Sequence, residues 1–271
     1  MPELPEVQTV VSGLRPRVVG RVISRVQMHR TDIVSPAGID LAPLLMGRMI
    51  SGIERRAKRI VFALDDRAQF YVHLGMTGQL TIEPAKAEVR NHTHMVIELK
   101  GAPAEQIRFR DPRRFGGVFW LGIDPAVEKN LGPEPLTLGS KRLAALLVNT
   151  RRAVKVALLD QKLIAGIGNI YADEALFEAK IHPRAMTHTL TFTQVRALNL
   201  AIKKVLRKAI KFRGSTLRDF VDAEGVVGSY RSRHKVYDRE GEPCPRCKKH
   251  KIERIVLGGR STCFCPGCQK G

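Results

Sequence analysis

The first chemically distinctive stretch lies at the start of the chain, where residues 2–6 read Pro-Glu-Leu-Pro-Glu. Removal of Met1 would turn Pro2 into a free secondary amine, which can attack an electrophilic carbon and form an iminium. Glu3 would then stand beside that amine as a group able to move a proton. The same residues also suit an ordinary helix start, because proline and acidic side chains are favoured in a first helical turn. Residues 2–6 alone leave both interpretations open.

Four cysteines near the other end of the chain have the spacing of a metal site. Two residues separate Cys244 from Cys247, two separate Cys265 from Cys268, and residues 248–264 lie between the pairs. Thiolates on two such turns can complete a tetrahedral shell around one structural Zn²⁺. Because four ligands leave no open position, we expect this ion to stabilise the fold, and we expect no catalytic metal. Two disulfides or loose surface thiols are the alternatives, and the low cysteine number and the lack of a signal-peptide pattern disfavour the disulfides.

The residues between the cysteine pairs predict a small zinc ribbon. Two short apolar runs flank Gly258 and Gly259, a dipeptide typical of a hairpin turn. Arg260 follows directly and would lie at the tip. The fifth cysteine, Cys263, has no place in a four-ligand shell, and we interpret it as a free thiol on the hairpin. A ribbon of about 30 residues buries little core, so metal ligation would supply its missing stability.

The composition points to a polyanionic partner. Lysine and arginine number 46 against 26 acidic residues, which gives a formal net charge of +20 and a sequence pI of about 10.3. Nucleic acid is the simplest partner for such a charge, and a merely solvated basic surface is the alternative. The basic residues occur in both halves of the chain, which favours a groove formed by folded domains over a disordered arm. No apolar run approaches the ~18 residues of a membrane span, and we expect a cytoplasmic protein without membrane contacts.

Periodic patterns predict an N-terminal helix followed by strands. Val7, Val10, Val11 and Leu14 form an apolar helical stripe, and Pro16 is expected to end that helix. Short β runs separated by glycine, proline and charged turns then predict two antiparallel sheets packed as a sandwich. The runs lie at residues 22–28, 60–64, 69–74, 79–82, 94–99, 106–110 and 117–121.

The second half of the chain is expected to be helical. Residues 152–163, 170–179 and 193–212 predict helices, and the last has an apolar face of helical period. The glycine-rich break at 166–169 is either a phosphate-binding turn or an ordinary helix–helix turn. The expected domains are a β-sandwich domain (2–131), a linker (132–139), a helical domain (140–235) and a zinc ribbon (236–271), with a flexible stretch at 222–234.

Six motifs follow one another along the chain. They are Pro-Glu-Leu-Pro-Glu at 2–6, Arg-Arg-Ala-Lys at 55–58, His-Leu-Gly-Met-Thr-Gly at 73–78, Asp-Pro-Arg-Arg-Phe-Gly at 111–116, Asp-Gln-Lys-Leu-Ile-Ala-Gly-Ile-Gly-Asn-Ile-Tyr at 160–171, and Gly-Glu-Pro-Cys at 241–244 before the ribbon. In this order they resemble the formamidopyrimidine-DNA glycosylase family, bacterial enzymes that remove oxidised purines from DNA. The resemblance covers nearly the whole chain, and its specificity rests on the combination of motifs.

The resemblance implies an α+β protein of two domains. An N-terminal helix with a two-layer antiparallel β-sandwich would be followed by a helical domain, with a helix–two-turn–helix motif, and a C-terminal zinc ribbon. The implied activity is that of a monomeric base-excision repair enzyme, whose partner is double-stranded DNA containing oxidised purines or abasic sites. Such an enzyme flips the damaged nucleotide out of the duplex and excises 8-oxoguanine or formamidopyrimidines. It then acts as an abasic-site lyase and cleaves the strand by β,δ-elimination.

The resemblance also assigns catalytic roles. Pro2 would attack the sugar C1′ as a Schiff-base nucleophile, and Glu3 would protonate the ring oxygen. Lys58 would contact a phosphate and assist elimination, although a lysine in a basic run is commonly just solvated. Arg260 would clamp a phosphate for δ-elimination, and Glu6 would line the lesion pocket.

Further residues are assigned to DNA by the same resemblance. Met76, Arg113 and Phe115 would fill the void left by the flipped nucleotide, with Arg113 donating hydrogen bonds to the orphaned cytosine. Core packing is the alternative for Met76 and Phe115, but the neighbouring Asp-Pro and Gly-Gly pairs favour an exposed turn. The remaining DNA-contacting candidates are His92, Arg151, Lys155 and Asn169. His92 could equally be a histidine on a surface strand without contact to DNA.

Two positions depart from the family pattern. Cys263 stands where relatives often carry histidine, and Asp238 stands where they usually have glycine. The stretch 222–234 corresponds to the loop that closes over the flipped base, and its composition indicates mobility without indicating a base preference. The mechanism also requires removal of Met1.

Two competing functions stay open. An endonuclease VIII-like glycosylase for oxidised pyrimidines would share Pro2, Glu3 and the ribbon, but Leu4 and the motif at 111–116 disfavour it. A non-enzymatic zinc-ribbon DNA-binding protein would explain the charge and the cysteines, but it leaves Pro2, Glu3 and Lys58 without a role. We favour the enzyme that acts on oxidised purines.

Overall fold

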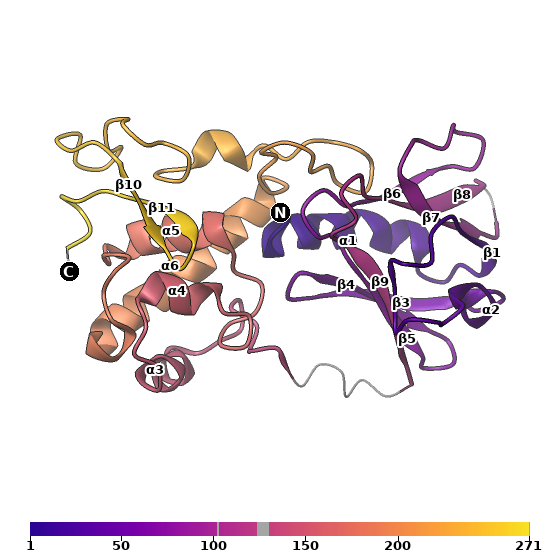
Figure 1. Ribbon diagram of the computed structural model, residues 1–271, viewed down its shortest axis with the longest axis horizontal. Coiled ribbons are helices and arrows are strands. Elements are labelled where there is room, and N and C mark those ends of the chain that lie inside the picture. The colour runs from indigo at the N-terminus through magenta and orange to yellow at the C-terminus, as the bar shows by residue number, and fades with distance from the viewer. Residues whose placement is uncertain (102, 124–129, 271) are drawn as a thin grey trace. The chain divides into compact units, whose positions relative to one another are not determined.

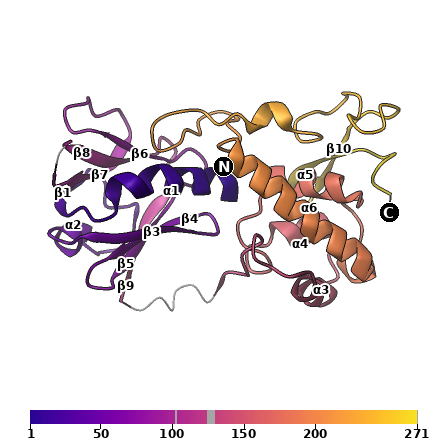
Figure 2. The same ribbon diagram turned by 180° about the vertical axis from the view of Figure 1, so that it is seen from behind.

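The computed structural model describes residues 1–101, 103–123 and 130–270. The chain divides into two compact units, one formed by residues 1–129 with 212–229 and the other by residues 130–211 with 230–271. Figures 1 and 2 show each unit from opposite sides. The first unit contains two sheets and a long helix, and the second contains helices and a β-hairpin, so the chain has the expected α+β class.

The N-terminal helix α1 (Leu4–Val18) carries the predicted apolar stripe into the core of the first unit. Val7 and Val10 are fully buried there. The expectation that Pro16 ends the helix is wrong, because the helix continues to Val18 and Val19 donates its N–H to the carbonyl of Arg15 at 3.2 Å. Proline removes its own N–H from the ladder, and in the last turn this loss affects a single helical bond.

Two sheets form the body of the first unit. One has the antiparallel order β1-β7-β8-β6, with bounds Ile23–Met28, Thr93–Leu99, Glu105–Arg110 and Gln79–Pro84. The other has the order β2-β9-β5-β4-β3, with bounds Val34–Ser35, Gly117–Gly122, Gln69–His73, Arg59–Leu64 and Ile50–Arg56. Helix α1 contacts β6 of the first sheet and β3 and β4 of the second, and all three layers share one apolar core. All seven predicted runs are strands, which confirms the expected two-sheet architecture.

The sequence patterns miss β2, β3 and the short helix α2 (Leu41–Leu45). Strand β2 spans two residues and pairs in parallel with β9, the one exception to antiparallel pairing among the described strands. Strand β3 contains a register shift between Ile50 and Gly52, so its buried residues Ile50 and Ile53 are three positions apart. A search for strict alternation cannot find a strand with such a bulge.

The second unit is built around four helices and a hairpin. Their bounds are α3 Ser140–Val148, α4 Val154–Leu159, α5 Asn169–Ala179, α6 Phe192–Lys211, β10 Glu253–Leu257 and β11 Arg260–Phe264, with short 3₁₀ turns η2 at Thr187–Thr189 and η3 at Tyr230–Arg233. Helix α6, the long orange helix of Figure 2, confirms the prediction for 193–212. Helix α4 ends earlier than 163, because the Asp160 carboxylate accepts the N–H of Lys162 at 2.9 Å and turns the chain. Within the described segments, no helix has the length and apolar character needed to span a bilayer.

The segment 212–229 follows α6 in sequence but packs with the first unit. Ile82 of β6 donates its N–H to the carbonyl of Ala223 at 2.8 Å, which attaches the segment to the edge of a sheet. A Cβ built on Gly13 of α1 would lie 2.9 Å from the Cβ of Ala223, so the segment also touches the helix closely. The predicted helical domain, residues 140–235, includes this segment, because nothing in the composition of the segment indicates where it packs.

Part of the stretch 222–234 is a hydrogen-bonded turn. The buried Asp222 carboxylate accepts the backbone N–H groups of Glu224 and Val226, each at 2.9 Å. The Arg213 side chain forms an ion pair with the same carboxylate. The glycine, serine and charged residues that predict flexibility here are also the residues that build such turns.

Candidate nucleic-acid interface and metal centre

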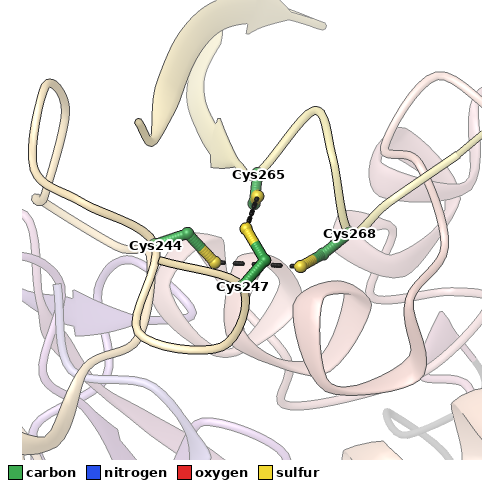
Figure 3. Close-up of side chains that lie close together, drawn as sticks. All are labelled: Cys244, Cys247, Cys265 and Cys268. Carbon is green, nitrogen blue, oxygen red and sulfur yellow. Dashed lines mark hydrogen bonds between the residues drawn. The ribbon is translucent and has the colours of Figure 1, made fainter. Parts of the chain in front are cut away.

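The four cysteines of the two C-x-x-C turns converge on one point. Their Sγ atoms all lie within 4.8 Å of one another, with 3.8 Å between Cys244 and Cys268 and 3.7 Å between Cys247 and Cys265 (Figure 3). Four sulfur atoms at the ~2.3 Å Zn–S distance of a tetrahedral site would be about 3.8 Å apart. The donor set and its spacing therefore fit a structural Zn²⁺ that closes the ribbon.

Cys263 lies outside this cluster and serves the packing of the ribbon. Its side chain is buried beside Phe177 of α5 and Val236. Its backbone N–H donates to Oδ2 of Asp173, also on α5, at 3.0 Å. The prediction of a free thiol on the hairpin is confirmed, and the thiol faces the interior of the second unit.

The start of α1 is held by a reciprocal pair of carboxyl groups. Glu3 is the N-cap residue and forms a capping box with Glu6, whose Oε2 accepts the N–H of Glu3 at 2.8 Å. Oε1 of Glu6 accepts the N–H of Ser215 at 2.7 Å. A Cβ on Gly214 would come 2.7 Å from that same Oε1 atom, so the chain passes very close to the carboxylate. Pro2, Glu3 and Glu6 are all buried, and Glu6 fixes the first helical turn to residues 214–215.

Lys58 lies in the tight turn between β3 and β4. The residue before it, Ala57, has φ +55°, and the Lys58 side chain is buried. Burial and the positive charges of Lys58 and Arg59 lower the pKa of His73 below its ordinary value. The His73 Nδ1 atom accepts the N–H of Gly75 at 3.1 Å, which requires an unprotonated Nδ1. Burial, together with the charges of Lys58 and Arg59, thus disfavours the protonated form of His73 at the base of the loop 74–78.

The three residues expected to fill the DNA void lie on two adjacent loops. Met76 is 45% exposed and Phe115 is 55% exposed, so the alternative of core packing is wrong for both. The Arg113 guanidinium lies over the Phe115 ring at 4.6 Å from its centroid, a cation–π arrangement. A Cβ on Gly75 would lie 2.4 Å from the Phe115 carbonyl carbon, which shows that the two loops run backbone against backbone.

His92 and Arg151 are exposed residues at the ends of secondary-structure elements. His92 has φ +67° in the turn before β7, and its carbonyl accepts the N–H of Asp111 at 3.0 Å. Arg151 follows α3 in the second unit. Both positions are compatible with contact to a phosphate, and neither has a role in a core.

Lys155 does not occupy a position that DNA can reach. Its side chain is fully buried, and its Nζ donates to the Asn169 carbonyl at 3.0 Å and lies 2.5 Å from Oδ1 of Asp173. The expected direct DNA contact by Lys155 therefore does not fit the structure. The ammonium instead joins α4 to the start of α5.

Asn169 and Arg260 lie on two elements that are hydrogen-bonded to each other. Asn169 begins α5, and its Nδ2 donates to the carbonyl of Ser261 at 3.0 Å. Arg260 begins β11 and is exposed. A Cβ on Gly258 would lie 3.2 Å from Val156 of α4, so the hairpin turn also rests on that helix. The structure thus brings together two of the predicted phosphate ligands of the second unit.

Several buried acidic residues that organise these loops could not be identified from the sequence. Asp111, Asp173 and Glu174 are buried, and each accepts backbone N–H groups from a different segment. The one sequence signal for Asp111 is its place at the start of the motif at 111–116. For Asp173 and Glu174 there is no such signal, because acids in a helix pattern are usually exposed.

Three family models match the chain in succession. The formamidopyrimidine-DNA glycosylase N-terminal domain matches residues 1–118, the formamidopyrimidine-DNA glycosylase H2TH domain matches residues 131–221, and the zinc finger found in FPG and IleRS matches residues 241–271. Together they cover both units and the four cysteines.

Relatives and solved structures agree with these models. A formamidopyrimidine-DNA glycosylase of Gluconobacter oxydans is 45% identical and one of Roseiflexus sp. is 44% identical, each matched over 100% of both chains. The complex between the Lactococcus lactis Fpg and an abasic site containing DNA has a TM-score of 0.91 at 34% identity, covering 99% of this chain and 100% of that one. A complex of the wild-type Lactococcus lactis Fpg with a N7-benzyl-Fapy-dG containing DNA has a TM-score of 0.91 at 35% identity, covering 100% of both. The chain belongs to the formamidopyrimidine-DNA glycosylase family.

Proposed function

We propose that this protein is a DNA glycosylase of base excision repair that removes oxidised purines and then cleaves the abasic strand. The observation that carries the proposal is the placement of Pro2 and Glu3 at the buried start of α1, in a chain whose family match spans both units. The substrates are 8-oxoguanine and formamidopyrimidines in double-stranded DNA. A single copy of the chain supplies every group that the reaction uses.

The first chemical step replaces the bond from the sugar to the base. After removal of Met1, the unprotonated Pro2 nitrogen attacks C1′ and the bond from C1′ to the base nitrogen breaks. The proton that the Pro2 nitrogen carries is then lost to the departing base, which leaves the nitrogen with a free lone pair. Glu3 protonates the ring oxygen, the ring C1′–O bond breaks, and the Pro2 lone pair completes an iminium. An α-amino group titrates near ~8, so a fraction of free base is present at neutral pH.

The iminium then drives strand cleavage. It acidifies the C2′–H bond, and loss of that proton expels the phosphate on C3′; loss of the C4′ proton from the resulting conjugated system expels the phosphate on C5′. Lys58 and Arg260 hold these phosphates and neutralise their charge during elimination. No catalytic metal is needed, and the four-thiolate zinc site only stabilises the ribbon.

Extrusion of the base precedes this chemistry. Unstacking a nucleotide costs a few kcal/mol, which apolar side chains inserted into the base stack offset. The exposed Met76 and Phe115 are suited to that insertion, and Arg113 can donate to the orphaned base while it stacks on Phe115. His92, Arg151 and Asn169 contact phosphates and fix the position of the duplex.

Borohydride trapping tests the proposal. Protein without Met1 is incubated with a duplex that contains 8-oxoguanine opposite cytosine, and the reduced adduct is mapped by mass spectrometry. An adduct on Pro2, absent in Pro2→Gly, is the expected result. A duplex with thymine glycol serves as the comparison, because preferential incision of that strand would assign the chain to oxidised pyrimidines instead. Tight binding without any adduct would leave a DNA-binding protein without this chemistry.

A further inference from the structure

Three segments of the first unit that carry predicted DNA contacts meet at one buried residue, Asp111. They are the loop 74–78 with Met76, the turn before β7 with His92, and the loop 111–116 with Arg113 and Phe115. Asp111 has no exposed surface. It directly follows the last residue of β8 and begins the loop 111–116.

The Asp111 carboxylate binds both loops at once. Oδ1 accepts the Thr77 hydroxyl at 2.5 Å and the N–H of Arg113 at 3.3 Å. Oδ2 accepts the N–H of Gly116 at 2.8 Å. Hydrogen bonds to an ionised carboxylate are stronger than neutral ones, and burial strengthens them further. The bond from Thr77 therefore fastens the Met76 loop to the loop that carries Arg113 and Phe115.

The backbone of Asp111 adds the third segment. Its N–H donates to the His92 carbonyl at 3.0 Å, and its carbonyl accepts the N–H of Arg114 at 3.2 Å. The buried His94 ring is hydrogen-bonded to the same carbonyl at 2.8 Å. One residue thus positions the segments that carry Met76, His92, Arg113 and Phe115.

The two loops have no space between them to absorb a displacement. A Cβ on Gly116 would lie 2.4 Å from the His73 carbonyl oxygen, and one on Gly75 would lie 2.4 Å from the backbone N of Gly116. Closely packed backbones that are also joined by a side-chain bond move together. Without that bond, each loop can shift separately, and the exposed side chains lose their common alignment.

We infer that Asp111 and Thr77 are positioning residues that join Met76, Arg113 and Phe115 into one rigid wedge. The inference rests on the proposed function, in which this wedge replaces the flipped nucleotide. A wedge must keep its shape while it parts two stacked bases, and small misplacements of such groups are costly in rate. The bond between Thr77 and Asp111 sets this alignment, and Asp111 does so from a fully buried position.

The test uses Thr77→Val, which removes the hydroxyl and keeps the shape, and Thr77→Ser, which restores it. The matched control is Thr81→Val, because Thr81 is a buried threonine of the same unit whose hydroxyl donates to Glu83 at 2.7 Å, away from the wedge. Each variant is assayed on a duplex with 8-oxoguanine opposite cytosine and on the same duplex with a preformed abasic site. Excision needs base extrusion, whereas the abasic site has no base to extrude.

We expect Thr77→Val to lower kcat/KM for 8-oxoguanine by about tenfold and to change abasic cleavage less than twofold. Thr77→Ser and Thr81→Val should stay close to the wild type on both. An equal loss on both substrates, at an unchanged melting temperature, would overturn the inference, as would full excision by Thr77→Val.

A second measurement separates this inference from the proposed function. A duplex with an uncleavable tetrahydrofuran abasic analogue opposite 2-aminopurine reports insertion of side chains by fluorescence, without any chemistry. A smaller fluorescence change with Thr77→Val than with the wild type, at saturating protein, supports the wedge even if no oxidised purine is excised. Equal changes would contradict it even if excision occurs.

Discussion

Lys155 and Asp173 form an ion pair that is completely buried, with 2.5 Å between Nζ and Oδ1 and no exposed surface on either side chain. The second carboxylate oxygen of Asp173 accepts the N–H of Cys263, and Nζ of Lys155 also donates to the Asn169 carbonyl. The pair therefore links α4, the start of α5 and the zinc hairpin. Burial raises the pKa of Asp173 to about 6, and the charge of Lys155 acts in the opposite direction.

The first prediction follows from this pair. Lys155→Met leaves the buried carboxylate without its counter-charge, which should lower the free energy of unfolding by about 3–5 kcal/mol. The double variant Lys155→Met/Asp173→Asn removes both charges and keeps an oxygen for the N–H of Cys263, so it should recover most of the loss. Denaturant unfolding of the zinc-loaded protein measures both changes.

The salt dependence of DNA binding then shows whether Lys155 stabilises the fold or contacts a DNA phosphate. If Lys155 neutralised a phosphate, its removal would reduce the slope of log affinity against log salt by about 0.9. We expect the slope of the double variant to equal that of the wild type, and Arg260→Ala to give the reduced slope. If the double variant bound DNA as weakly as Lys155→Met and also had a reduced slope, Lys155 would be shown to contact DNA.

The second prediction concerns zinc. The ribbon has few apolar contacts of its own, so removing the metal should unfold the hairpin and weaken DNA binding. Cys263, which is 4% exposed, should then become reactive toward a thiol reagent together with the four ligands. Five reactive thiols in the chelated wild type and four in Cys263→Ala are the expected counts. Four in the chelated wild type would show that the hairpin stays packed without metal.

The third prediction is a loss of stability in mild acid through His73. Its pKa is lowered in the folded protein, so its contribution to stability is complete above the ordinary value near ~6.5 and is lost as the pH falls through the lower folded value. Protonation of Nδ1 also ends its acceptance of the Gly75 N–H. In His73→Asn, the amide oxygen can replace Nδ1 without titrating.

Thermal unfolding at pH 7.5 and at pH 5 measures the effect. The wild type should lose more stability between these values than His73→Asn, by about 1 kcal/mol for the hydrogen bond and the charge repulsion together. Zinc release in acid affects both proteins alike. Equal losses would show that His73 does not titrate in this window.

Strands and helices whose buried side chains recur at a regular spacing can be predicted from the sequence. An element in which one residue breaks that spacing is missed. Seven strands and α6 follow from periodicity, whereas β3 is hidden by the shift between Ile50 and Gly52. The zinc ligands are the most predictable part of the site, because their chemistry depends on spacing along the chain. The exposed turn with Phe115 is also predictable, from the glycines and the proline around it.

The partners of the charged residues could not be predicted in the same way. Lysine is rarely buried, so a lysine in a basic chain is expected to lie on the surface. Lys155 is buried because it forms an ion pair with Asp173, a contact that the sequence does not indicate. Asp111 and Thr77 lie more than thirty positions apart in the sequence. Such contacts depend on how strands and loops pack, which no local pattern encodes.

The fourth prediction concerns Glu6, whose two oxygens serve two backbone donors. Glu6→Gln keeps one oxygen and places an amide N–H₂ against the other donor, which is the N–H of Glu3 or of Ser215. Leaving one buried N–H without an acceptor should cost about 1–3 kcal/mol. Because Glu3 follows Pro2 directly, the misplaced first turn should also reduce the yield of borohydride-trapped adduct.

Glu54→Gln is the matched control, because Glu54 is an exposed acid on β3 in the same unit. It should leave both unfolding and trapping unchanged. If Glu6→Gln were as stable as the wild type but failed to form the adduct, Glu6 would act on the lesion itself, as the family resemblance implies. If stability and trapping fall together, and the adduct recovers when the reaction is run well below the melting temperature, the carboxylate acts by holding the helix start. The two outcomes assign Glu6 either to the pocket or to the scaffold beneath Pro2.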